Sequence, residues 1–347
     1  ENLIALELHE KRSAGQPFGI YGDIYLEARR TAFVEDIMVE SYFNEDLSVA
    51  NLVVNVQAMN MGKPTTVSPI ATLYAPDGSE VAHTVASTPE LKKKKGGKVQ
   101  LKLLVLNPYL WTDETPFLYT LNVTLGDEIF TQKYGIRLMN GRDGTFHMNN
   151  RPITIQCADM SDAGIHDRGV NLIQQWEKDI QTIKDLNLNA VCVNEKTCDP
   201  RLYALCDHYG LYVLNHKKNE TYYDISSIRD QAKHADIKKT CRKVSFKLEG
   251  NRLIICNNHT FTSLKNYRIH FTLIQKPNAR AAKGDVLMQG HQDLPDVQPG
   301  NNVALQYPLP PVDKRSVAIL NVTLEQKNTT PWTKAGMVVA EESIRIE

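Results

Sequence analysis

Hydrophobic and polar residues alternate along the first third of the chain, and this alternation predicts short β-strands. A period of two places every second side chain on one face of a half-buried strand. Turn signals such as Pro76-Asp77-Gly78 and Gly96-Gly97 separate the alternating segments. The spacing predicts an antiparallel β-sandwich of about a hundred residues. Its strands are expected over 34–39, 47–56, 70–74, 98–105 and 118–125, after two alternating segments at 4–8 and 20–26.

The pattern changes after Arg137 to a series in which strands and helices alternate. Pro200 suits the first turn of a helix, and Gly210 suits the left-handed position that ends one. The order strand, helix, strand, helix, strand predicts parallel strands with right-handed crossovers. These elements are expected over 152–155, 171–188, 189–193, 200–209 and 211–214.

The helical pattern fades through a polar, charged stretch from Asp224 to Lys239, and strands then return. The final third is therefore predicted to be a second all-β region. Its strands are expected over 244–247, 253–256, 267–273, 303–307, 316–324 and 338–346.

Charge and composition narrow the functional classes. The 347 residues include 40 basic and 40 acidic side chains, so no net field attracts nucleic acid or an anionic membrane. The longest apolar run, 101–106, contains Lys102 and is far shorter than the ~18 residues of a membrane span. We expect neither a nucleic-acid partner nor a membrane span.

The six cysteines have neither CxxC nor zinc-finger spacing, so no metal and no cofactor are expected. Cys192 and Cys206 lie in apolar stretches, where a cysteine is usually a small buried hydrophobe. N-glycosylation sequons are compatible with a secretory route without requiring one, and the compartment stays open. They lie at Asn122, Asn219, Asn258, Asn321 and Asn328.

Several strings give the chain a family resemblance. The most specific is NPYLWTDETPFLYTL at 107–121, and LYALCDHYGLYV at 202–213 is nearly as close to a family string. The chain resembles glycoside hydrolase family 2, and within it the large bacterial β-galactosidases, over nearly its whole length. Further similar strings are GIYGDIYL at 19–26, YGIR at 134–137 and GTFHMNNRPI at 144–153.

The resemblance implies a mostly β, multidomain fold. It implies an immunoglobulin-like β-sandwich, an incomplete α/β barrel of the TIM type with about three βα units, and a C-terminal β-sandwich. The corresponding ranges are 1–29 for the end of a sugar-binding jelly roll, 30–136 for the first sandwich, 137–239 for the barrel remnant and 240–347 for the last sandwich.

The catalytic half of the barrel has no counterpart in the sequence. A retaining glycosidase uses two carboxyl groups about 5 Å apart at the carboxyl ends of barrel strands. The family takes these groups from the fourth and seventh strands. Fewer than ninety residues separate Pro152 from Lys239, whereas a whole barrel needs ~200. The segments that would supply both carboxylates do not follow Tyr223, so no catalytic residue is predicted.

The surviving strand ends still carry candidate residues, because ligand sites in α/β sheets lie at the carboxyl ends of strands. Glu195 and Glu220 are the candidate catalytic carboxylates, although solvated loop residues without chemistry are the favoured interpretation. The candidate binding residues are Asp159, Asn194 and His216. Asp162 and His166 lie in the same group of predicted loops.

Three functions remain open. The leading hypothesis is a catalytically inactive relative that serves as a structural or protein-binding subunit. A few parallel strands cannot close on themselves, so a protein partner or self-association is expected to cover their edge and apolar face. The first alternative is an active β-galactosidase-like hydrolase whose missing strands come from another chain. The second is a carbohydrate-binding protein without turnover, with Trp111 and Trp332 as possible stacking surfaces, although packing is the favoured role for both.

Overall fold

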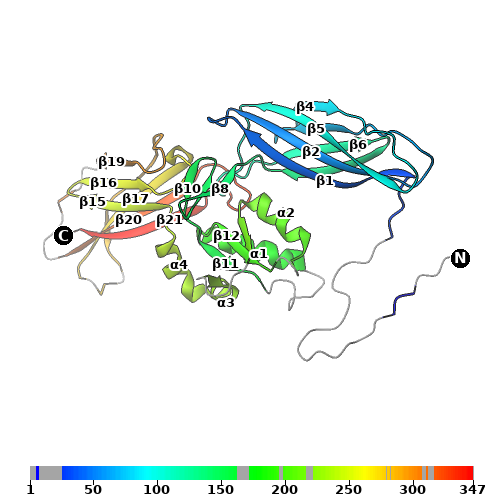
Figure 1. The fold of residues 1–347 in the computed structure, drawn as a ribbon. Coiled ribbons are helices and arrows are strands. Elements are labelled where there is room, and N and C mark those ends of the chain that lie inside the picture. Colours follow the sequence, from blue (N-terminus) through cyan, green and yellow to red (C-terminus); the bar gives the residue numbers. More distant parts are fainter. Residues whose placement is uncertain are drawn as a thin grey trace.

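The structure of the chain is a computed structural model. It describes residues 5–7, 26–161, 172–194, 198–215, 222–278, 280–281, 283–306, 310–311 and 316–346. Within these residues, two antiparallel β-sandwiches flank a parallel sheet that carries helices (Figure 1). The predicted fold class, mostly β with an incomplete α/β barrel, is confirmed. Most of the predicted jelly-roll remnant at 1–29 lies outside the described residues.

The first sandwich consists of two antiparallel sheets, with strand orders β1-β2-β5 and β4-β3-β6-β7. Every second residue is buried along β2 and the second half of β5, as the alternating sequence predicts. Leu52 and Leu103 lie opposite each other in these strands, and both are fully buried. β4 was not predicted, because it is a largely exposed edge strand. The strands are β1 (Ala32–Phe43), β2 (Val49–Asn60), β3 (Ile70–Tyr74), β4 (Glu80–Val85), β5 (Lys95–Leu106), β6 (Tyr119–Leu125) and β7 (Glu128–Tyr134).

A small antiparallel sheet connects the first sandwich to the parallel sheet. It contains β8 (Met139–Arg142), β9 (Thr145–Met148) and β10 (Arg151–Ile153). Asp143 and Gly144 turn the chain between β8 and β9 with φ of 50° and 75°. Met148 and Ile153 are buried against the parallel sheet, so this connection is part of a core.

The parallel sheet has the strand order β13-β12-β11-β14. Its strands are β11 (Cys157–Asp159), β12 (Ala190–Val193), β13 (Tyr212–Asn215) and β14 (Tyr223–Asp224). One face packs against the helices α1 (Leu172–Asp185) and α2 (Pro200–Tyr209), with Val191 of the sheet and Ile180 of α1 in the same buried cluster. Within the described residues the sheet is open at β13 and β14, so no closed barrel forms.

Helix α2 has the ends that its sequence predicts. The Asp199 carboxylate caps its first turn by accepting a hydrogen bond from the Arg201 backbone N–H. Gly210 ends it in the left-handed conformation, with φ of 74°, and donates its N–H to the Cys206 carbonyl.

The stretch from Asp224 to Lys239 is helical, although no helix was expected there. It contains α3 (Ile225–Arg229), η1 (Gln231–Lys233) and α4 (His234–Thr240). Each α-helix has one buried hydrophobic side chain, Ile228 in α3 and Ile237 in α4. One apolar residue per short helix is too few to produce a helical period, which is why the expectation was wrong.

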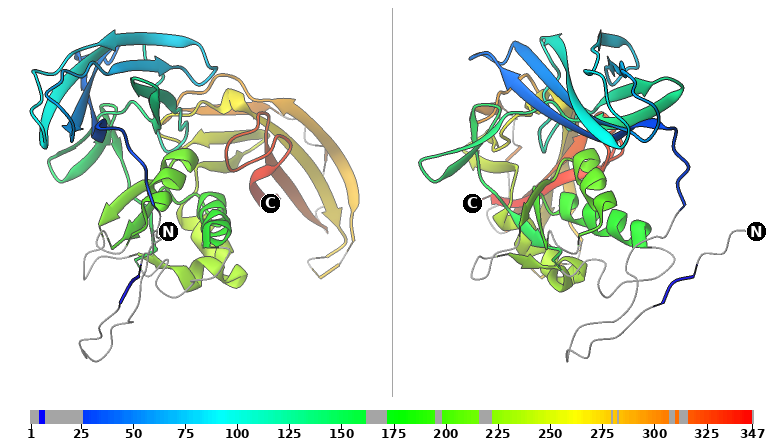
Figure 2. Two further views of the ribbon diagram at one scale, coloured as in Figure 1. Left: turned by 90° about the vertical axis from the view of Figure 1, so that its right-hand side faces the viewer. Right: turned by 45° about the vertical axis from the view of Figure 1, so that its right-hand side comes forward.

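The C-terminal sandwich has the strand orders β15-β16-β19 and β18-β17-β20-β21. Leu253, Ile269 and Leu320 are fully buried between its sheets. The long edge strand β18 was missed, because most of its side chains are exposed. Its elements are β15 (Val244–Glu249), β16 (Arg252–Asn257), η2 (Leu264–Asn266), β17 (Tyr267–Lys276), β18 (Asp285–Asp293), β19 (Asn302–Gln306), β20 (Val317–Gln326) and β21 (Val338–Ile346). Figure 2 shows the curved sheets of this sandwich beside the helices.

Candidate functional site

The carboxyl ends of the parallel strands bring two of the predicted site residues to one edge. Asp159 ends β11, and Asn194 follows β12 directly. Asp159 is half-buried, and its carboxylate accepts the Ser161 backbone N–H at 2.9 Å, whereas Asn194 is exposed. The other candidates, Glu195, His216 and Glu220, lie outside the described residues.

A second carboxylate, Asp224, lies beside Asp159 because β14 pairs with β11 in register. It caps α3: its oxygens accept hydrogen bonds from the Ser226 hydroxyl and from the Ser227 hydroxyl and backbone N–H. These bonds lower the pKa of Asp224 well below its usual range, with Ser226 contributing most. Asp224 is therefore an ionised cap and is unsuited to donate a proton near neutral pH.

This edge of the sheet does not contain a glycosidase pair among the described residues. A retaining mechanism needs one carboxyl group that donates a proton and a second that attacks the sugar. Of the described residues that end these strands or directly follow them, only Asp159 and Asp224 carry carboxylates, and Asp224 caps a helix. Across the described part of the chain, no three His, Cys, Asp or Glu side chains gather as metal ligands.

The face of the sheet away from the helices holds a disulfide between Cys157 and Cys192. Both cysteines are buried, as the apolar surroundings of Cys192 predict. Cys192 was predicted to be a buried hydrophobic residue, and its disulfide with Cys157 was not predicted. The two residues lie 35 positions apart, and only the pairing of β11 with β12 brings their Cα atoms to 6.4 Å.

This same face is covered by the chain itself. Trp111, Met148 and Ile153 form a buried cluster with the first residues of β11, β12 and β13. The apolar face that was expected to need a partner therefore already has a cover. The cover lies over the amino-terminal ends of the strands, whose residues are Cys157, Ala190 and Tyr212.

Trp111 is a packing residue and offers no surface for a sugar. It is 1% exposed, and its indole N–H donates to the Asp207 carbonyl at 2.8 Å. The Arg137 guanidinium lies 4.5 Å from its ring centroid and also pairs with the Asp207 carboxylate at 2.8 Å. These contacts attach the first sandwich to α2.

Glu114 connects the first sandwich to the C-terminal one. Its carboxylate accepts the backbone N–H groups of Thr260, Phe261 and Thr262 at 2.8 to 2.9 Å. Burial disfavours charge on Glu114, but the neighbouring His259 and Lys243 and the backbone N–H groups outweigh it and lower its pKa to about 2. Sequence reasoning placed this residue only within a family string.

Asp113 and Lys184 connect the first sandwich to the parallel sheet and its helices. The Lys184 ammonium donates to the carbonyls of Asp113 and Gly210 at 2.6 and 2.9 Å. Burial lowers the pKa of Lys184 to about 8 despite the nearby charge of Asp113. The Tyr212 hydroxyl donates to the Asp113 carboxylate at 2.7 Å. The loop 113–114 therefore contacts all the other parts of the fold.

Trp332 is placed differently from Trp111, since it is half-buried and lines a cavity of about 830 Å³. The cavity lies where α1 and α4 meet the C-terminal sandwich. The Lys184 ammonium lies 4.2 Å from the centroid of the Trp332 ring. Phe117, Met337 and Val338 also line the cavity and are partly exposed.

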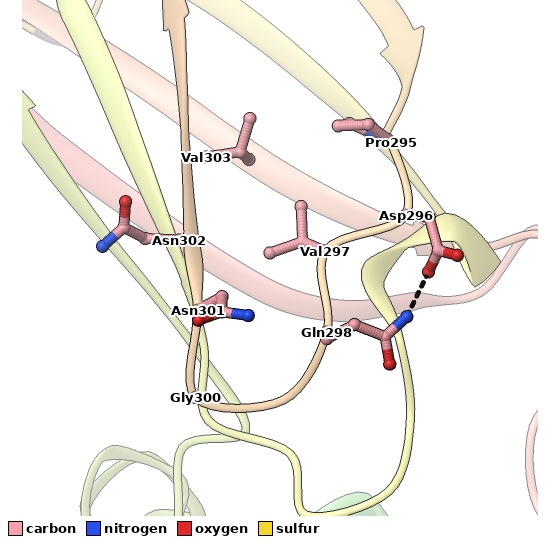
Figure 3. Close-up of a pocket in the computed structure, with 8 residues that line it drawn as sticks. All are labelled: Pro295, Asp296, Val297, Gln298, Gly300, Asn301, Asn302 and Val303. Atoms are coloured by element: carbon pink, nitrogen blue, oxygen red, sulfur yellow. Dashed lines mark hydrogen bonds between the residues drawn. The ribbon is translucent and has the colours of Figure 1, made fainter.

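A second hollow of about 460 Å³ is formed by the loop 295–303 (Figure 3). Asp296 is the acidic residue of its lining, and its carboxylate accepts hydrogen bonds from Gln298 and from the Ser263 hydroxyl. The lining contains no second titratable side chain, so this hollow offers no acid–base chemistry. In the described part of the chain, every helix is too short or too polar to cross a bilayer.

Comparison with known proteins relates the chain to β-galactosidases. It is 30% identical to a β-galactosidase of Staphylococcus xylosus over 59% of this chain and 19% of that protein. It is 31% identical to a β-galactosidase of Leuconostoc mesenteroides over 59% of this chain and 20% of that protein. The chain thus spans about a fifth of the length of these curated relatives.

Among solved structures, a β-glucuronidase of Parabacteroides merdae overlaps 53% of this chain and 24% of its own, with a TM-score of 0.44 and 21% identity. Three family models match consecutive parts of the chain. They describe glycosyl hydrolases family 2 at residues 32–137, the TIM barrel domain of that family at 139–252, and domain 4 of β-galactosidase at 253–347. These matches account for nearly every residue of the fold described above, and the chain is a member of glycosyl hydrolase family 2.

Proposed function

We propose that this chain does not hydrolyse glycosides and acts as a structural or protein-binding subunit. The main support is the carboxyl edge of the parallel sheet, where Asp224 caps α3 and Asp159 is the remaining carboxylate among the described strand ends. Because Asp224 is held as a helix cap, Asp159 alone does not make a retaining or inverting pair. The contacts of Glu114 and Trp111 between separate parts of the fold support a scaffold that keeps these parts together.

Turnover of a chromogenic β-galactoside by the purified chain tests this proposal. The Staphylococcus xylosus relative, a β-galactosidase, serves as the positive control. We expect no hydrolysis above a heat-denatured sample, and no change in Asp159→Asn, Glu195→Gln or Glu220→Gln. Hydrolysis that disappears in one of these variants would overturn the proposal and identify that carboxylate as catalytic.

Active hydrolysis with barrel strands supplied by another chain is the second candidate. It is favoured by the match to β-galactosidases and by the open edges of the parallel sheet. This candidate predicts β-galactosidase activity that accompanies the tagged chain from its native extract and is lost when the chain is purified alone.

Carbohydrate binding without turnover is favoured by one observation, the partly exposed ring of Trp332 in its cavity. Trp111 and Trp176 are each 1% exposed, so a galactoside should change the fluorescence of Trp332 only. Titration of the wild type against Trp332→Phe tests this candidate. A signal that is present in the wild type and absent in the variant would favour it, and a flat titration would remove it.

A further inference from the structure

β14 is the edge strand of the parallel sheet next to β11, the first parallel strand in the sequence. β14 pairs with β11 on the side opposite β12, giving the order β13-β12-β11-β14 with all neighbours parallel. In a closed α/β barrel, the last strand pairs with the first. β14, followed by α3 and α4, therefore stands where a closing βα unit would stand.

The chain leaves little room between β13 and β14. Only residues 216–222 connect them, whereas a parallel crossover normally takes a dozen residues or more. β14 contains just Tyr223 and Asp224, at the level of the carboxyl end of β11. Within the described residues, the result is half of an eight-stranded barrel with a free edge on each side.

The free edge of β13 has backbone groups that can pair with another strand. The Tyr212 backbone N–H donates to the Asn189 carbonyl at 2.8 Å, so Tyr212 faces β12. Backbone groups of successive residues in a strand point to opposite sides. Val213 and Asn215 therefore direct their N–H and C=O groups toward the free edge.

The inner face of this half-barrel is filled more completely at one end than at the other. The first residues of β11, β12 and β13 are buried beneath Trp111 and its neighbours. Toward the carboxyl ends, Asp159 and Leu214 are half-buried and Asn215 is exposed. The cover supplied by the chain thus leaves the upper layer of the barrel interior incomplete.

We propose that two copies of this chain close one eight-stranded parallel barrel, in which β13 of each copy pairs with β14 of the other. A two-fold axis along the barrel keeps every strand parallel and uses each free edge once. The strand number favours a second copy over an unrelated partner, because the four strands of the described sheet are half of the required eight. This inference deepens the proposed function and rests on its protein-binding role.

The test combines mass, a matched pair of variants and hydrogen exchange. Val213→Pro removes the outward N–H, and proline is tolerated on an edge strand whose N–H points to solvent. Val213→Thr keeps both the N–H and the β-branched shape. We expect light scattering to give twice the 39.2 kDa chain mass for the wild type and for Val213→Thr. Because the ring has two such junctions, Val213→Pro should raise the dimer dissociation constant at least about tenfold.

Amide hydrogen exchange at β13 of the wild type tests the same interface even if Val213→Pro does not fold. The amides of β13 should be protected at high protein concentration and exchange faster on dilution. A monomer at high micromolar concentration, or a dimer in which β13 exchanges freely, would overturn the proposal. Glycoside turnover is measured on the same samples, so hydrolysis would contradict the proposed function without bearing on how the barrel closes.

Discussion

Glu114 and Lys243 form a largely buried ion pair, with 3.2 Å between Oε1 and Nζ, at the junction of the two sandwiches. Glu114 belongs to the loop between β5 and β6 of the first sandwich, and Lys243 precedes the first strand of the second. Lys243 also lies 3.8 Å from the Asp113 carboxylate. Burial disfavours charge on Lys243, but Asp113 and Glu114 outweigh it and raise its pKa. The two neighbouring carboxylates therefore stabilise the positive charge of Lys243.

We predict that Glu114→Gln destabilises the chain by about 3 kcal/mol, because it leaves the largely buried Lys243 ammonium with a weaker partner. The amide also has fewer acceptor sites for the three backbone N–H groups. Urea unfolding at pH 7 measures the loss. Glu249→Gln, in the exposed pair with Lys247, is the control and should unfold with the wild type. Equal midpoints for the two variants would contradict the prediction.

Lys184 should make stability rise with pH in the alkaline range. The folded chain holds Lys184 at a pKa of about 8, below its ordinary value of 10.5. Between these values the unfolded chain binds more protons, so the free energy of unfolding increases with pH. Below pH 8 the full cost of the buried ammonium remains, about 3 kcal/mol for a shift of this size.

Lys184→Met removes this titration. The free energy of unfolding of Lys184→Met relative to that of the wild type should therefore fall by about 3 kcal/mol between pH 8 and 10.5. Lys178→Met, at an exposed position of the same helix, is the matched control. Urea unfolding at several pH values gives the comparison, and a difference that stays constant with pH would show that Lys184 does not titrate in this range.

Gly210 should tolerate no side chain. Its φ of 74° is left-handed, and a Cβ would lie 2.5 Å from the Asp113 carbonyl oxygen. Gly126 has a similar φ of 63° with nothing within 4 Å. We predict that Gly210→Ala costs about 2 kcal/mol more than Gly126→Ala, because only the first adds a clash to the backbone strain. Thermal unfolding of both variants measures the difference, and equal losses would show that the loop at Asp113 moves aside.

The disulfide between Cys157 and Cys192 closes a loop of 35 residues. The chain-entropy relation for such a loop gives a stabilisation of about 4 kcal/mol. We predict that the double variant Cys157→Ala/Cys192→Ala unfolds at correspondingly lower urea, whereas Cys198→Ala, at a free and partly exposed cysteine, changes little. Peptide mapping without reductant should recover the Cys157–Cys192 link, and finding both thiols free would rule it out.

Local patterns were sufficient to predict the elements that have a clear hydrophobic period or distinct end residues. The ends of α2 were predicted because Pro200 and Gly210 act through the conformation of their own backbone. The alternation in β2 and β5 likewise predicts which side chains are buried. By contrast, β14 contains two residues and α4 has one buried apolar residue, so neither produces a periodic signal.

Only part of the site was predictable, because many of its contacts join residues that are far apart in the sequence. Asp159 and Asn194 could be assigned to one edge because parallel strands end together. The contacts of Glu114 with Thr260 and Phe261 span about 150 positions of sequence, and no local rule pairs them. The bond between Cys157 and Cys192 depends in the same way on which strands become neighbours.

The buried cluster over the amino-terminal ends of the parallel strands limits which fragments of this chain can fold alone. Trp111, Ile153 and Phe261 contribute to it from three widely separated stretches of sequence. A fragment that carries the parallel strands alone would expose Cys192 and Tyr212 to water, however carefully its ends were chosen. The parallel sheet should therefore not be studied as an isolated fragment, because residues of the first sandwich and of the C-terminal region complete its core.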